Sequence, residues 1–104
     1  MDLSRANLCN ADLRGYNLKG ADLNRTNRRE ANLSTIDFRE VDLRTTNLSG
    51  AILHGANLHG VDLRGTNLKS ADLTKADLSE TRLGAANLRG ANLRGANLTN
   101  ADFT

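Results

Sequence analysis

Hydrophobic residues recur along this chain with a period of five. Counting from Leu3 to Phe103, every fifth residue is Leu or Phe at twenty of twenty-one positions, and the exception is Arg28. The residue two places earlier is small or β-branched in nearly every repeat, and the residue just before is Asp or Asn in nineteen of the twenty-one. Because this register never slips, we expect one repeat domain over residues 1–104, without linkers or inserted loops.

A period of five excludes both an amphipathic helix and a plain strand. Five helical residues advance about 140° beyond a full turn, so the leucines would spread around the helix axis. In a strand, an odd period would send successive leucines to opposite faces. A short extended segment with two inward side chains two residues apart, followed by a turn, fits the pattern, and the Asn, Asp and Gly at outward positions favour turns. The chain is therefore predicted to coil with its leucines inside.

The number of sides in each coil follows from a longer recurrence. Residue types repeat every twenty positions, most clearly in the series Asn7, Asn27, Asn47, Asn67 and Asn87. Four five-residue sides per coil would place such residues above one another, about 4.8 Å apart. We therefore expect an all-β solenoid of about five coils, in which each coil hydrogen-bonds to the next.

The repeats ADLRG, ANLHG, ANLRG, ADLTK and ANLTN carry a family resemblance. They match the consensus A(D/N)LXX, so the whole chain resembles the pentapeptide-repeat family. This resemblance implies a right-handed quadrilateral parallel β-helix and a bacterial, above all cyanobacterial, setting. It also implies roles that differ between members: some protect DNA gyrase from quinolones by imitating duplex DNA, and others act in cyanobacterial development or as interaction modules.

Four residues break the repeat pattern. Arg28 stands at a leucine position, and we expect it to point to solvent near Glu30, because an unpaired buried charge costs several kcal/mol. The alternative is a buried guanidinium that anchors a ligand or a partner carboxylate. Tyr16 stands at an alanine position and is expected to fill space that Arg28 leaves, although a pocket there is an alternative. Ile52 and Arg82 replace Asn or Asp and are expected on the surface.

Residues with reactive side chains do not form a catalytic or metal-binding constellation. His54 and His59 are expected on adjacent sides of one coil, as solvated side chains without a third ligand. Cys9 is expected as a free surface thiol, which fits a reducing compartment and hence the cytoplasm. No run of eighteen apolar residues and no phosphate-binding loop is present. We expect no enzyme activity, no cofactor and no membrane partner.

Charge sorted by side leads to the functional hypothesis. The side that carries Arg29, Lys69 and Arg89 is basic, and the opposite side of the coil is acidic. The net charge of the chain is +2. A DNA mimic requires a dense negative surface, and nucleic-acid binding favours interleaved aromatics, which make up only 3% of the chain. The sequence therefore predicts a non-enzymatic scaffold for protein–protein contact, with Arg29, Lys69 and Arg89 as candidate contact residues. The alternative is a DNA mimic that binds gyrase or another topoisomerase and protects it from quinolones.

The two ends of the repeat carry no recognisable cap. An uncapped solenoid leaves backbone groups and core side chains open at its ends. We therefore expect the ends to pair with another copy of the chain or with further parts of a longer protein.

Overall fold

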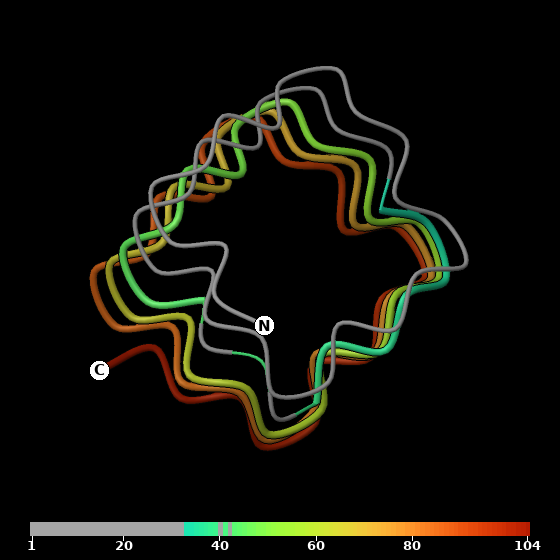
Figure 1. Ribbon diagram of the computed structural model, residues 1–104. Coiled ribbons are helices and arrows are strands. Elements are labelled where there is room, and N and C mark those ends of the chain that lie inside the picture. Colours follow the sequence, from blue (N-terminus) through green and yellow to red (C-terminus); the bar gives the residue numbers. More distant parts are fainter. Residues whose placement is uncertain (1–32, 40, 42) are drawn as a thin grey trace.

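The computed structural model describes residues 33–39, 41 and 43–104. Viewed along the axis, the chain winds as a four-sided coil whose successive turns lie above one another (Figure 1). Expectations that concern Cys9, Tyr16, Arg28 and Arg29 lie outside the described residues.

Adjacent coils pair in parallel with a fixed offset. Each parallel bridge among the described residues joins positions twenty apart, as in Ile52 with Asp72 and Asp72 with Asn92. Two backbone bonds surround each such pair: Leu53 donates to the Asp72 carbonyl at 2.7 Å, and Asp72 donates to the Ala51 carbonyl at 2.9 Å. The described residues form such isolated bridges and turns, and they include no continuous strand and no helix. The predicted twenty-residue coil is confirmed.

A tight turn at each corner resets the chain direction. The N–H of Ala56 donates to the carbonyl of Leu53 at 3.0 Å, which closes a four-residue turn, and Gly55 at its third position has φ +68°. A positive φ at that position is typical of a type II turn and favours glycine. The same corner holds Lys75 one coil later with φ +57°, so the turn also tolerates residues that pay a steric penalty there.

The interior is a stack of leucines. Central leucines from Leu33 to Leu83 are at most 3% exposed, and Phe38, at an equivalent central position, is fully buried among them. Small or β-branched residues two positions earlier fill the rest, and some are threonines whose hydroxyls need partners. Thr66 Oγ1 donates to the Leu43 carbonyl at 2.9 Å, so its burial leaves no polar group unsatisfied. The prediction that the leucines face inward is confirmed.

The last coil, residues 85–104, has an open face. Leu88, Leu93 and Leu98 are only partly buried there, and Phe103 is 56% exposed. No further coil covers these residues within the described structure, so their side chains form an apolar rim at this end of the solenoid. The described residues contain no helix with the length and hydropathy that a membrane crossing requires.

Candidate interaction surface

A recurring hydrogen bond holds the outward side chains in columns. The Asn or Asp before each central leucine accepts, through Oδ1, the backbone N–H two residues later, as in Asn67 to Lys69 and Asn87 to Arg89, both at 3.0 Å. This local bond is the reason that Asn and Asp suit the position. The repeats that carry Asn or Asp share this bond, and the parallel bridges place side chains twenty residues apart in rows along the axis.

We call one of the four sides the asparagine side, because Asn occupies its bridge position on each described coil; it comprises residues 46–50, 66–70 and 86–90. Lys69 and Arg89 lie on it, on neighbouring coils, and both are exposed. The N–H of Ser70 donates to the carbonyl of Arg89 at 2.8 Å, which places these two repeats directly side by side. The structure thus brings two predicted contact residues together, and their binding role stays a prediction.

The aspartate side, residues 61–65, 81–85 and 101–104, carries charges of both signs. Arg64 donates to Asp62 through Nε at 2.9 Å and Nη2 at 2.7 Å. This side-chain hydrogen bonding lowers the pKa of Asp62 to about 2 and raises the pKa of Arg64. The guanidinium of Arg64 is therefore committed to a neighbour on its own coil.

Arg82 interrupts the Asp column of the same side. It is exposed, and it bridges to Asp62 on one side and to Asp102 on the other. Hydrogen bonds from Arg64 and Thr104 are the main causes that lower the pKa of Asp62 and Asp102, and the positive charge of Arg82 adds to both shifts. An Asp at position 82 would place a third carboxylate between Asp62 and Asp102. Arg82 avoids this repulsion, which gives the departure from the repeat a structural reason.

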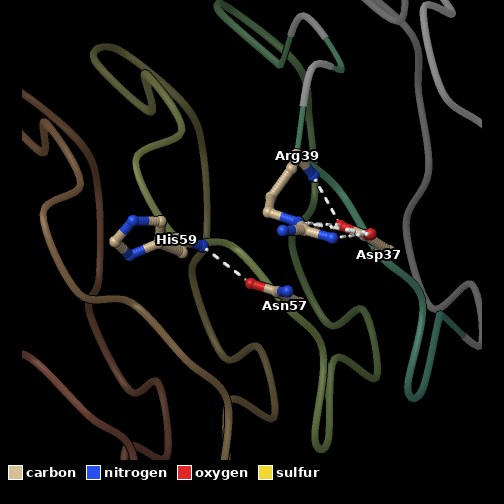
Figure 2. A network of polar contacts seen from close by, with 4 residues as sticks. All are labelled: Asp37, Arg39, Asn57 and His59. Atoms are coloured by element: carbon tan, nitrogen blue, oxygen red, sulfur yellow. Dashed lines mark hydrogen bonds and ion pairs between the residues drawn. The ribbon is translucent and has the colours of Figure 1, made fainter.

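A similar ion pair occupies the side that carries His59. Arg39 folds back onto Asp37, with Nη2 2.8 Å from Oδ2, and one coil later Asn57 accepts the backbone N–H of His59 at 3.1 Å (Figure 2). Asp37 and Asn57 are partners in a parallel bridge and hold equivalent turns. The acceptor is a charged carboxylate at Asp37 and a neutral amide at Asn57.

The sequence predicts solvated histidines, but each of the two has a hydrogen-bond partner. His54 Nδ1 lies 2.7 Å from Thr74 Oγ1, and Thr74 Oγ1 in turn donates to Asp72 at 2.6 Å. His59 repeats this arrangement one side further on, with Ser79 and Asp77 at 2.7 and 2.6 Å. Although both imidazoles are exposed, each is oriented by a hydroxyl on the next coil.

The order of these chains decides what they can do. In a nucleophilic triad, histidine stands between the hydroxyl and the carboxylate and removes the hydroxyl proton. Here the hydroxyl stands in the middle and donates its hydrogen bond to the carboxylate, so the histidine Nδ1 must donate to the hydroxyl oxygen and cannot act as its base. The hydroxyl hydrogen bonds instead lower the pKa of Asp72 and Asp77. In the described ranges, no three His, Cys, Asp or Glu side chains converge as metal ligands.

Ile52 lies at a bridge position opposite Asp72 and is 39% exposed. We call its side the Ile52 side; it comprises residues 51–55, 71–75 and 91–95. This side also carries the exposed Lys75 and Arg94. A single exposed isoleucine of this kind is ordinary on a protein surface. Nothing around it forms a larger apolar patch among the described residues of this side.

Comparison with known proteins agrees with the geometry. A parallel coil of four five-residue sides defines the chain as a quadrilateral β-solenoid. The family model of pentapeptide repeats matches in eight copies, over residues 2–39, 31–69 and 66–104. The chain belongs to the pentapeptide-repeat family, and its fold is the right-handed quadrilateral β-helix of that family.

Solved structures give the same result. HetL, a pentapeptide repeat protein involved in heterocyst differentiation regulation in the cyanobacterium Nostoc sp. strain PCC 7120, is 40% identical with a TM-score of 0.77. The match covers 97% of this chain and 46% of HetL, so the chain spans about half the length of that relative. A pentapeptide repeat protein of the Arabidopsis thaliana thylakoid lumen is 28% identical over 91% of this chain and 59% of its own, with a TM-score of 0.53.

QnrB1, a plasmid-mediated fluoroquinolone resistance protein, is more distant. It is 23% identical over 96% of this chain and 63% of its own, with a TM-score of 0.43, and this likeness does not bear on function. No curated protein matches the chain.

Proposed function

We propose that the chain is a non-enzymatic scaffold that binds a protein partner through the sides of its solenoid. The observation that carries this proposal is the fixed ladder of outward side chains, in which each Asn or Asp is held by its own turn and each row is repeated on the next coil. Surface groups that are already ordered lose little conformational freedom on binding. HetL, a pentapeptide repeat protein that resembles this chain in structure, is involved in heterocyst differentiation regulation. A regulatory contact with another protein, in the cytoplasm, is the role we propose here.

The absence of enzyme activity is part of this proposal. The histidine, hydroxyl and carboxylate groups of the described residues have the wrong order for a nucleophilic triad. A catalytic site also needs a position where a substrate meets base and oxyanion donors together, and no such position can be assembled from these side chains.

The scaffold is tested by affinity capture with the immobilised chain, followed by direct binding of the purified partner. We expect a protein from the source cells to be retained and to bind saturably. A matrix that carries an unrelated solenoid is the control. Equal retention on both matrices, or turnover of a substrate by the purified chain, would refute the scaffold.

The DNA-mimic alternative is less well supported. Cations and carboxylates alternate on the aspartate side, where Arg64 and Arg82 accompany Asp62 and Asp102, in place of a continuous negative surface. We expect no effect of the chain on DNA gyrase supercoiling, with or without a quinolone. Protection of gyrase in that assay would restore the alternative.

A second copy of the chain is the partner we propose for the open last coil. Its leucines are half-buried and Phe103 is 56% exposed, while comparable leucines one coil earlier are buried. The backbone of that coil also presents an unpaired sheet edge, which favours association with another edge.

Self-association is measured by light scattering over a range of concentrations. We expect the mass to rise with concentration, and Phe103→Glu to suppress the rise because it places a charge in the apolar rim. Ile52→Glu is the matched control, since it adds the same charge at an exposed apolar residue on a side. A constant mass for the unmodified chain, or equal effects of both substitutions, would contradict end-to-end pairing.

A further inference from the structure

The asparagine side differs from the other three in its acidic groups. Among the described residues it carries no Asp or Glu. Each of the other sides carries at least one: Asp62 and Asp102 on the aspartate side, Asp72 on the Ile52 side, and Asp37, Asp77 and Glu80 on the His59 side. In this part of the side, the charged side chains are therefore cations alone.

Three of the cations on the other sides are partly neutralised by their neighbours. Arg39 and Arg64 form ion pairs of 2.8 and 2.7 Å, and Arg82 lies between two carboxylates. Lys69 and Arg89 form no ion pair in the described part of the chain, although both are exposed and lie on adjacent coils. Their repeats are stacked at about the 4.8 Å backbone spacing of the ladder, so the two residues follow one another along the coil axis.

The asparagines leave this side rich in hydrogen-bond donors. The Oδ1 atoms of Asn67 and Asn87 each accept a backbone N–H at 3.0 Å. The amide NH₂ groups of Asn67 and Asn87 add neutral donors beside the two cations. A row of amide donors beside an ammonium and a guanidinium matches carboxylates, which only accept.

From these observations we infer that the asparagine side binds an acidic segment of a protein partner, with two carboxylates lying along the coil axis over Lys69 and Arg89. This inference rests on the proposed scaffold function. The ladder spacing is close to the 5–6 Å that separates residues four apart on a helix, so an acidic helix laid parallel to the axis suits the site. Nucleic acid fits less well, because two cations without an aromatic platform do not form a strand-binding groove.

The probe is a fluorescein-labelled helical peptide of about 15 residues with glutamates four apart, measured by fluorescence anisotropy at about 0.1 M salt. The same peptide with Gln in place of Glu controls for non-ionic binding. We expect the acidic peptide to bind the unmodified chain and the Gln peptide not to bind. The double substitution Lys69→Glu and Arg89→Glu should weaken binding at least about tenfold, because it turns both attractions into repulsions.

The matched control is Lys75→Glu with Arg94→Glu on the Ile52 side. Both residues are exposed, and the pair changes the net charge by the same amount. We expect it to weaken binding by less than about threefold, since charges beyond a Debye length of about 10 Å are screened. Circular dichroism and thermal unfolding of both variants check that the solenoid is intact.

Three results would overturn the inference: no binding of the acidic peptide, equal losses in the two double variants, or tighter binding of an oligonucleotide than of the peptide. The partner captured in the scaffold experiment separates the two proposals. If that partner binds the Lys69→Glu and Arg89→Glu variant unchanged, the acidic segment is refuted and the scaffold stands. If no partner is captured, the scaffold itself fails.

Discussion

The middle coils and the last coil share one sequence pattern but differ in what that pattern achieves. Leu63 is fully buried, whereas Leu93, at the centre of a repeat with the same turn, is only partly buried. Both repeats close their turns with the same backbone bond, from Thr66 to Leu63 at 3.0 Å and from Ala96 to Leu93 at 2.9 Å. The local structure is therefore set within the repeat, and the burial is set by the coils above and below.

This difference is characteristic of a solenoid, in which stability is the sum of each repeat and its contacts with neighbouring repeats. A middle coil has two neighbours and the last described coil has one. The same leucine should therefore contribute more to the free energy of unfolding in the middle than at the open end.

Leucine truncation tests this comparison with the largest effect. We expect Leu63→Ala to lower the free energy of unfolding by about 2–5 kcal/mol, because it leaves a cavity in a fully packed column. Leu93→Ala should cost roughly half as much, since less area returns to water and the open face can relax. Urea titration followed by circular dichroism measures both. Equal losses would mean that the last coil is covered in solution, as end-to-end pairing would require at high concentration.

The fold followed from the sequence because its information is periodic. Five-residue spacing specifies the inward leucine, and the twenty-residue recurrence specifies which residues stack, so the adjacency of Lys69 and Arg89 was within reach of the sequence. The contact of His54 with Thr74 was not, because it depends on side-chain rotamers as well as on the register. A sequence signal for it exists nonetheless: a histidine, with Asp eighteen and Thr or Ser twenty residues later, occurs at both His54 and His59.

The five-residue repeat also does not show which cations form ion pairs. Arg64 and Lys69 occupy equivalent positions after a central leucine, yet only Arg64 is paired. The difference lies two residues earlier, where Asp62 supplies a carboxylate and Asn67 supplies an amide. Counting charges per side detects the basic surface, and the choice between Asp and Asn within each repeat determines which cations stay available.

Backbone strain at the corners offers a test of intermediate size. Gly65 and Ala85 occupy the same corner on consecutive coils, with φ +72° and +59°. A Cβ on Gly65 would meet nothing within 4 Å, so Gly65→Ala should cost about 1–2 kcal/mol through the left-handed backbone alone. Ala85→Gly should stabilise by less than about 1 kcal/mol, because glycine also gains freedom in the unfolded chain. Thermal unfolding of both variants measures the pair. A destabilising Ala85→Gly would show that the first residues of the last coil are not held in this conformation.

Acid titration compares the two regions with the smallest effect. The pKa of Asp62 is about 2 in the folded middle coils, below its ordinary 3.8, chiefly because Arg64 hydrogen-bonds to it. The resulting stabilisation is present above pH 3.8 and is lost as the pH falls towards 2. Asp62→Asn keeps the turn, as Asn67 does, so we expect it to be less stable than the unmodified chain at neutral pH and equal to it near pH 2.

Asp102→Asn should flatten the dependence of stability on pH less than Asp62→Asn does, because Asp102 is bonded to Thr104 in the exposed last coil. Fraying of that coil releases the contact before global unfolding. Urea midpoints from pH 5 to pH 2 measure these curves, and a constant offset between Asp62→Asn and the unmodified chain would show that the Arg64 contact does not report on folding.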